Sequence, residues 1–243
     1  MDANMTFKRY ELKYILNRFQ RDALLRAMEG HLALDIYGHS TIRNIYYDTD
    51  SWRLVRRSVE KPYYKEKLRV RAYGSPKPET PVFVELKKKF DHVVYKRRLM
   101  LPCKAAMEGL QSGHTLPAAP TDQQIALEIE AFKEFYGPTL QPAMLLTYER
   151  EAFFPVDGVD FRLTLDENLL WRTEDIDLCA PLGGRYIIDP DLLILELKTP
   201  GGIPLWMTQF LSRHRIYQTS ISKYGTAYTQ WLMEDKNGGK LYA

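Results

Sequence analysis

The amino-acid sequence predicts an α+β fold in which a mostly antiparallel sheet is the main element. Segments with strand character outnumber segments with helical character, and helices do not alternate with them one for one. The clear strands carry one apolar and one charged face, as antiparallel strands do when a single side of the sheet is buried. With 243 residues, 45% of them hydrophobic and 12% aromatic, the chain can build a sizeable core and is not disordered.

The first part of the chain contains five predicted strands, Phe7–Leu16, Thr41–Asp48, Tyr64–Tyr73, Pro81–Lys88 and Val93–Leu101. Alternation of apolar and charged residues with the period of a strand is clear in Lys67–Tyr73 and Val82–Lys88, less clean in the first strand, and ambiguous in Val93–Leu101. A helix should begin after Asn17, because Gln20 completes a capping box with it. Ser51–Val59 is expected to form a short helix, and Pro102 is expected to open another.

The second part contains three further predicted strands, Ala143–Glu151, Val159–Asp166 and Leu192–Thr199. A helix is expected from Thr121, with a capping box to Gln124, to about Tyr136. Two helices, near Pro204–Arg213 and Ser222–Met233, close the chain. No internal repeat and no linker separates these elements, so residues 1–243 are predicted to form a single domain.

Basic residues are concentrated in one part of the sequence. Between Arg53 and Arg98 there are 15 Lys and Arg against 5 Asp and Glu, although the whole chain has a net charge of only +3. Such segregation is typical of a surface or cavity that binds an anion, but a solvated basic sheet face would have the same composition.

The charged residues fall on the polar faces of the predicted strands. If the sheet curls into a barrel with its apolar faces outward, ten basic residues line the interior: Lys13, Lys67, Arg69, Arg71, Lys87, Lys96, Arg98, Arg150, Arg162 and Lys198. Only four acidic residues join them, Glu11, Glu85, Asp166 and Glu196. Unpaired buried charge is costly, so this interior requires a polyanion, and phosphate chains suit the forks of Arg and the point charges of Lys.

Eight short motifs occur in the order of a known family. They are Tyr10–Tyr14, Ile45–Thr49, Lys67–Arg71, Val82–Lys87, Tyr148–Arg150, Arg162–Asp166, Leu195–Lys198 and Ser222–Tyr224. Together they resemble the vacuolar transporter chaperone (VTC) domain, the polyphosphate polymerase branch of the CYTH or triphosphate tunnel metalloenzyme superfamily. The resemblance implies an eight-stranded antiparallel tunnel barrel with flanking helices.

The resemblance also implies the roles of individual residues. Phosphate-binding positions fall on Lys13, Arg69, Arg71, Lys87, Lys96, Arg150, Lys198 and Lys223, with Tyr148 beside the phosphate chain. Glu196 falls on the carboxylate that holds Mn²⁺ or Mg²⁺, and Arg69, Arg71 and Lys198 are expected to act with it in the chemical step. Ser222 and Lys223 begin the last helix, where a phosphate is favoured by the helix dipole. Either Arg56 or Arg57 is expected to supply a further arginine.

The implied activity is metal-dependent transfer of the ATP γ-phosphoryl group to polyphosphate. The first strand has Arg9 where the wider superfamily often has the first Glu of Glu-x-Glu-x-Lys, which favours the polymerase over an inorganic triphosphatase. The expected ligands are ATP, polyphosphate or tripolyphosphate, and coupling to a membrane would require a separate partner. The alternative from another class is a non-catalytic polyanion- or RNA-binding module, suggested by Lys87–Lys89 and Lys96–Arg98; no nucleic-acid partner is expected if the tunnel forms.

The remaining candidates for chemistry are set aside. Five scattered histidines and two cysteines lack metal-ligand spacing, and no P-loop or nucleophile elbow is present. Tyr46 and Tyr47 are interpreted as packing aromatics. No apolar run approaches the roughly 18 residues of a membrane helix, and no signal peptide is recognised. A reducing, cytoplasmic setting is therefore expected.

Overall fold

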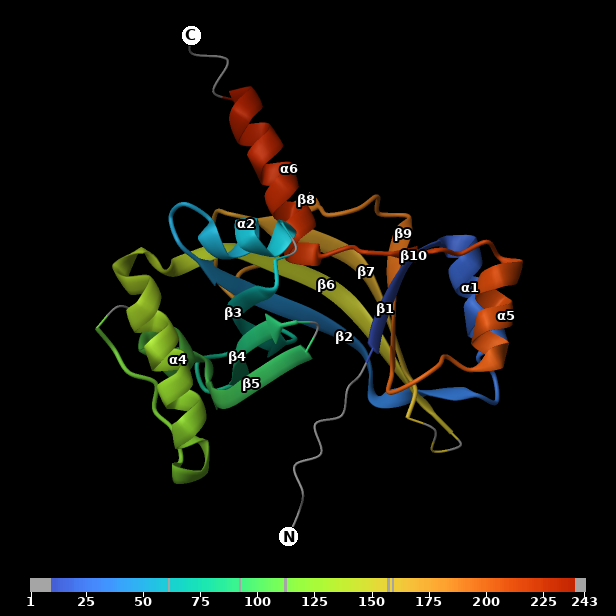
Figure 1. The fold of residues 1–243 in the computed structure, drawn as a ribbon, viewed down its shortest axis with the longest axis horizontal. Coiled ribbons are helices and arrows are strands. Elements are labelled where there is room, and N and C mark those ends of the chain that lie inside the picture. Colours follow the sequence, from blue (N-terminus) through green and yellow to red (C-terminus); the bar gives the residue numbers. More distant parts are fainter. Residues whose placement is uncertain are drawn as a thin grey trace. The chain divides into compact units, whose positions relative to one another are not determined.

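The computed structural model describes residues 10–238 except 61, 92, 112, 157 and 159. The strands are β1 Tyr10–Asn17, β2 Leu32–Asp48, β3 Tyr64–Tyr73, β4 Pro81–Phe90, β5 Val93–Pro102, β6 Gln141–Pro155, β7 Arg162–Arg172, β8 Arg185–Tyr186, β9 Leu192–Thr199 and β10 Gln218–Thr219. The helices are α1 Arg18–Ala27, α2 Arg53–Val59, α3 Cys103–Gly109, α4 Gln123–Tyr136, α5 Leu205–Arg213 and α6 Lys223–Gly238, with 3-10 turns at Pro120–Asp122 and Gly137–Thr139 (Figure 1). Within these described residues, every helix is too short or too polar to cross a membrane.

The strands form one antiparallel sheet, which confirms the predicted α+β class. Their hydrogen-bonded order is β10-β1-β9-β7-β6-β2-β3-β4-β5, with β8 paired to β7. This order has two ends, so over the residues described the sheet is open and the predicted closure into an eight-stranded barrel is not found. One end is β5, which carries Lys96, Arg97 and Arg98, and charged side chains disfavour pairing at a sheet edge.

The chain divides into two compact units. Of the described residues, unit 1 contains 10–40, 148–169 and 188–221, and unit 2 contains 41–147, 170–187 and 222–238. Three strands, β2, β6 and β7, have residues in both units. The single-domain assignment stays a prediction.

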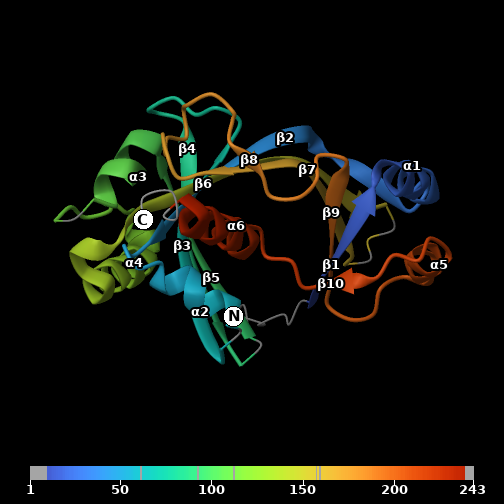
Figure 2. The same cartoon turned by 90° about the horizontal axis from the view of Figure 1, so that it is seen from above.

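The core of unit 1 lies between its strands and the helices α1 and α5, which are side by side (Figures 1 and 2). The leucines of the alternating strands face this core, and they pack with Leu24 of α1 and Phe210 of α5. At the start of α1, the side chain of Asn17 accepts the N–H of Gln20, and the Gln20 side chain accepts the N–H of Asn17. The predicted capping box is therefore confirmed.

The core of unit 2 lies between β3, β4 and β5 and the helix α4, drawn in yellow-green in Figure 1. The apolar residues of these strands pack against Ile129 and Phe132 of α4. Arg97 lies on the face of β5 that meets α4, because its Nε donates to the carboxylate of Glu128 at 3.1–3.2 Å. The strand's other charged face, with Lys96 and Arg98, is thereby turned away from the core.

Several boundaries differ from those predicted. β2 begins at Leu32 instead of Thr41. The sequence did not predict its first part, because residues 33–41 are largely exposed on both faces and show no alternation. β6 extends beyond the predicted Ala143–Glu151 at both ends, whereas β7, predicted as Val159–Asp166, both begins and ends later, at Arg162 and Arg172. The two-residue strands β8 and β10 are too short to leave a periodic signal. The Thr121 capping box was wrong, because Pro120–Asp122 forms a 3-10 turn and α4 starts at Gln123 without a side-chain cap.

Candidate functional site

Charged residues of unit 1 are aligned across three neighbouring strands. Lys13 of β1 pairs with Glu196 of β9, and Glu196 pairs with Thr164 of β7. The next row contains Glu11, Lys198 and Arg162 in the same order. Residues paired directly across an antiparallel sheet point to the same face. Six charged side chains are connected by ion pairs in this region, including Arg150 of β6 and Asp166 of β7. We call them the Glu196 cluster: Glu11, Lys13, Arg150, Asp166, Glu196 and Lys198.

The carboxylate of Glu196 is buried and lies near three cationic groups. Its Oε1 is 3.5 Å from Lys13 Nζ, and its Oε2 is 3.5 Å from Arg150 Nη2 and 3.7 Å from Lys198 Nζ. These separations are ion pairs, but they exceed the 2.7–2.9 Å of a typical charge-assisted hydrogen bond. The two oxygens of Glu196 are thus surrounded by positive charge from Lys13, Arg150 and Lys198.

Arg150 is fixed by a different carboxylate. Its Nε and Nη2 donate to the two oxygens of Asp166 at 2.5 and 2.6 Å, and its guanidinium lies over the ring of Tyr148. Burial would lower the pKa of Arg150, but the negative charges of Asp166 and Glu196 and the Tyr148 phenol outweigh it and raise that pKa well above its ordinary value. This arginine is permanently charged, and its orientation is set before any ligand binds.

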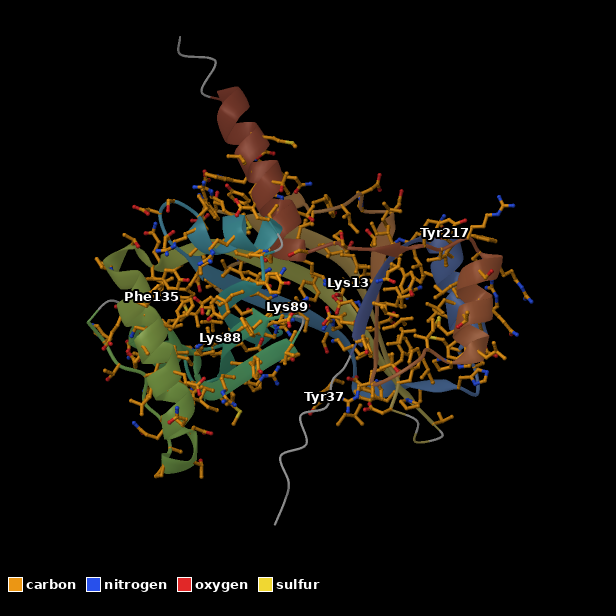
Figure 3. All side chains as sticks on the ribbon, viewed as in Figure 1. Lys13, Tyr37, Lys88, Lys89, Phe135 and Tyr217 are labelled. Atoms are coloured by element: carbon orange, nitrogen blue, oxygen red, sulfur yellow. The ribbon has the colours of Figure 1, made fainter. Side chains whose placement is uncertain are left out.

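The two lysines of the cluster differ in environment. Lys13 Nζ is 3.2 Å from Glu11 and donates to the carbonyl of Ile221 at 3.3 Å, which orients the side chain on β1 (Figure 3). Burial lowers the pKa of Lys198, although Glu196 opposes the change. A desolvated ammonium of this kind gains from an anionic ligand.

Unit 2 has its own carboxylate among cations, which we call the Glu85 cluster: Tyr46, Arg69, Glu85, Lys96 and Arg98. Tyr46, Arg69, Glu85 and Arg98 form one row across β2, β3, β4 and β5. Glu85 is 1% exposed and accepts hydrogen bonds of 2.6–2.8 Å from Arg69 and 2.7 Å from Arg98 Nε, with Lys96 Nζ at 2.8 Å. Both oxygens of this carboxylate are therefore saturated with donors.

The charges of the Glu85 cluster shift its titrating groups. Burial would raise the pKa of Glu85, but Arg69, Arg71 and Lys96 hold it well below its usual range. Burial lowers the pKa of Lys96 to about 8, against the influence of Glu85. Tyr46 accepts a hydrogen bond from Arg69 at 3.0 Å; burial would raise its pKa, but Arg69, Lys67 and Arg71 lower it to about 8.

Lysines fill the next rows of the same sheet face. Lys67, Lys87 and Lys96 are paired directly across β3, β4 and β5, and Lys65 is paired with Lys89 (labelled in Figure 3) one row further. Like charges placed opposite one another destabilise a sheet unless an anion lies between them. Rows two residues apart are separated by about 7 Å along a strand. Unit 2 therefore offers an extended cationic surface that begins at Glu85.

Arg71 is buried one row to the other side of the Glu85 cluster. Its Nε donates to Asn44 Oδ1 at 2.9 Å, and Asn44 in turn donates to the carbonyl of Leu146 at 3.3 Å. A short polar chain from the backbone of β6 thus orients this arginine.

The start of α6 is held by the other parts of unit 2. Ser222 Oγ accepts the N–H of Gly225 as the helix cap, and it also accepts a hydrogen bond from Lys67 Nζ at 3.3 Å. Tyr224 stacks on Tyr46 and donates its hydroxyl to Asp48 at 2.9 Å. The fully buried carboxylate of Asp48 accepts three backbone N–H groups, from Thr49, Leu54 and Val55 at 2.8–2.9 Å, and so anchors the start of α2.

Comparison with known proteins identifies the family. The sequence matches the VTC domain over residues 8–232. The chain belongs to the VTC domain family. A comparison of the same chain with curated proteins found no match.

Two solved structures show the fold. One is a candidate adenylate cyclase from Bacillus halodurans, with 15% identity and a TM-score of 0.53 over 88% of this chain and 95% of that one. Another is HpAC1 from Hippeastrum, a candidate adenylyl cyclase with dominant triphosphatase activity, with 15% identity and a TM-score of 0.54 over 91% and 95%. The VTC domain thus has a CYTH-like fold, and its family membership implies an enzyme that handles the phosphoryl groups of a triphosphate or ATP.

The residues of unit 1 fit a divalent cation that takes most of its ligands from the substrate and water. Among the residues that the structure describes, no three His, Cys, Asp or Glu side chains gather as a complete metal-ligand set. An ion with only one or two protein carboxylates takes its other ligands from substrate phosphates and water, which is usual for Mg²⁺ at phosphoryl-transfer sites. Glu196 is the candidate carboxylate for such an ion, whereas hydrogen bonds from Arg69 and Arg98 and an ion pair with Lys96 already occupy both oxygens of Glu85.

The predicted residues fall into two sets. Unit 1 brings Lys13, Arg150, Glu196 and Lys198 together; Arg162 follows in the next row, exposed, with its guanidinium over Phe154. Tyr148 also lies in unit 1, beneath the guanidinium of Arg150. The other predicted residues belong to unit 2, which brings together Lys67, Arg69, Arg71, Lys87, Lys96, Arg98 and Ser222, while Lys223 begins α6. Arg56 and Arg57 are both exposed on α2, and Arg9 lies outside the described residues.

Sequence reasoning missed three residues of β2. Tyr46, interpreted as packing, holds Arg69, and Asn44 holds Arg71. Asp48 anchors two helix starts. The signal that could have found them is their alternation, since residues 44, 46 and 48 share the face that carries the arginines of β3.

Proposed function

We propose that this VTC domain transfers the γ-phosphoryl group of ATP to the end of a polyphosphate chain, with Mn²⁺ or Mg²⁺ as cofactor. A terminal oxygen of the polyphosphate attacks the γ-phosphorus, the bond from that phosphorus to the bridging oxygen breaks, and ADP leaves. The observation that supports a chain-like substrate is the row of Lys67, Lys87 and Lys96, continued by Lys65 and Lys89.

A surface of this length suits a polyanion better than a single phosphate group. The row through Glu85 and the two lysine rows span about 14 Å along the strands. Lysine supplies point charges that follow a flexible anion, while Arg69 and Arg98 supply planar forks that Glu85 holds in place. We assign phosphate binding to Lys67, Lys87, Lys96 and Arg98 in unit 2, with Ser222 and Lys223 at the start of α6.

Phosphoryl transfer requires positioned charge and no protein nucleophile. We assign that charge to Arg69 and Arg71 in unit 2 and to Lys198 in unit 1, since each is oriented by neighbours before substrate binds. Lys13, Tyr148, Arg150 and Arg162 are assigned to phosphate binding in unit 1. Glu196 is assigned to the cation, which supplies charge neutralisation at the phosphate oxygens when it is bound.

The decisive experiment follows the phosphorus products of ATP and Mn²⁺ by ³¹P NMR. The proposal expects a growing signal from internal phosphates together with ADP. Release of orthophosphate alone would replace the polymerase by a triphosphatase, and no turnover would remove the enzymatic assignment. Lys87→Gln should shorten the product chains, whereas Lys88→Gln, the neighbour on the opposite face of β4, should leave them unchanged.

A competition experiment separates the proposal from an RNA-binding module. Tripolyphosphate in excess should displace single-stranded RNA of any sequence from the protein, because both would occupy the same cationic residues. RNA binding that persists under excess tripolyphosphate would favour the binding module. A cytoplasmic setting and coupling to a membrane through a separate partner belong to the same proposal.

A further inference from the structure

Thr164 of β7 has a buried hydroxyl without a partner. The residue is 8% exposed, and Oγ1 makes no hydrogen bond with any residue that the structure describes. Buried hydroxyl groups are nearly always hydrogen-bonded, because leaving one unsatisfied costs free energy. Such an atom in a charged cluster points to a ligand that satisfies it when bound.

The position of Thr164 indicates which ligand this is. Thr164 is paired directly with Glu196 across β7 and β9, so the hydroxyl and the carboxylate occupy the same face of the sheet. The Cβ atoms of such a pair lie about 5 Å apart. Glu196 itself is 6% exposed, which leaves the two groups in one desolvated patch.

The chemistry of the pair favours a hard cation. A carboxylate and a hydroxyl are both oxygen ligands, and a Ser or Thr hydroxyl ligates Mg²⁺ in P-loop proteins. The neighbouring Lys13, Arg150 and Lys198 repel a bare cation, so the ion must arrive with anionic phosphate oxygens. Glu196 and Thr164 would then supply its two protein ligands.

We propose that Thr164 Oγ1 is a second protein ligand, beside Glu196, for the divalent cation of the substrate complex. The inference rests on the assignment of Glu196 to that cation in the proposed function. It makes Thr164 a metal-binding residue on β7, in addition to the carboxylate on β9.

The test compares the affinity for tripolyphosphate with Mn²⁺ and with EDTA, by calorimetry. In the wild-type protein, Mn²⁺ should tighten binding. Thr164→Val keeps the shape of the side chain and removes the oxygen; it should reduce the gain from Mn²⁺ about tenfold or more and leave the affinity in EDTA unchanged. Thr164→Ser should keep the gain. Thr208→Val is the matched control and should behave as the wild type, because Thr208 is exposed on α5 and its hydroxyl donates to the Pro204 carbonyl.

The melting temperature of the metal-free protein adds an independent readout. Removal of an unsatisfied buried hydroxyl should leave the melting temperature of Thr164→Val at or above that of the wild type. A lower melting temperature would mean that the hydroxyl has a structural partner, and it would overturn the proposal. Thr164→Cys gives a second check, because a thiolate ligand should move the metal preference from Mn²⁺ toward Zn²⁺; an unchanged preference would count against coordination.

A further variant, Glu196→Gln, distinguishes failure of this inference from failure of the proposed function. If Glu196→Gln removes the gain from Mn²⁺ but Thr164→Val retains it, Thr164 is not a ligand and the assignment of Glu196 stands. If Thr164→Val weakens tripolyphosphate equally with Mn²⁺ and EDTA, the hydroxyl binds phosphate instead and the proposal is overturned. If neither Mn²⁺ nor Glu196→Gln changes the wild-type affinity, the metal assignment fails and the inference fails with it.

Discussion

The same tripeptide, Glu-Leu-Lys, occupies Glu85–Lys87 in unit 2 and Glu196–Lys198 in unit 1, in two different environments. Glu85 receives hydrogen bonds of 2.6–2.8 Å from two arginines, while Lys13, Arg150 and Lys198 lie 3.5–3.7 Å from the oxygens of Glu196. The first carboxylate holds its neighbours in place, and the second is the one that we assign to a divalent cation in the proposed function. The same local motif therefore occurs in two environments, and the partners that the fold supplies distinguish the two carboxylates.

The largest expected effect comes from Glu196→Gln. Phosphoryl transfer supported by Mn²⁺ should fall by about a hundredfold or more, because the isosteric amide removes the charge that holds the cation. The free energy of unfolding should fall by less than in the Glu85 variant below, because Lys13 keeps Glu11 and Arg150 keeps Asp166, although Lys198 loses the carboxylate of Glu196. Turnover assays over a range of Mn²⁺ concentrations measure the first effect, and urea unfolding measures the second. Normal turnover in the variant would contradict the assignment of Glu196, but not Glu85, to the cation.

The matched variant in unit 2, Glu85→Gln, should act mainly on stability. It leaves Arg69, Lys96 and Arg98 without their common counter-ion, which would cost several kcal/mol in a fully buried site. The side chains of Lys96 and Arg98 are 40% and 38% exposed, so solvent reduces the expected loss to about 2 kcal/mol. Equilibrium unfolding in urea measures it. A loss no larger than that of Glu196→Gln would show that the short contacts of Glu85 carry no extra stability.

A third effect, largely absent at neutral pH, concerns the pH dependence of the Glu85 cluster. The pKa of Tyr46 is lowered from 10.0 to about 8 in the folded protein, so its phenolate stabilises the fold above pH 10, and this contribution is lost as pH falls through about 8. The stability of the wild type relative to Tyr46→Phe should therefore rise between pH 8 and 10, by at most about 3 kcal/mol. Unfolding of both proteins across this range tests the sign, and tyrosinate absorbance should show one fewer group titrating near pH 8 in the variant. A flat difference would mean that the arginines do not favour the phenolate.

The sequence predicted the fold class and the charged faces because alternation is a local property. Leu163, Leu165, Leu195 and Leu197 face the core of unit 1, as their spacing indicates. Boundaries were predicted less well, since β2 continues through residues that are exposed on both faces and have no periodic signal. Closure of the sheet was also beyond the local pattern, because it depends on which edge strands meet.

The candidate residues were predictable, but their partners were not. Arg69 and Arg71 belong to a visible basic alternation, whereas the residues that orient them, Tyr46 and Asn44, lie more than twenty positions earlier on β2. Thr164 was overlooked for a similar reason. Its importance comes from the register that pairs it with Glu196, and a hydroxyl carries no charge that would reveal it in the sequence.

The pairing of β1 with β9 has a consequence for synthesis of the protein. The two strands are joined over eight residue pairs, from Tyr10 with Thr199 to Asn17 with Leu192. The hydrogen bond between Asp48 and Tyr224 likewise joins residues that are 176 positions apart in the chain. A ribosome must therefore synthesise the chain as far as Thr199 before β1 can complete its pairing with β9, and as far as Tyr224 before Asp48 reaches its partner. Folding should be slow for a chain of this size, and the nascent N-terminal segment should be a natural substrate for chaperones.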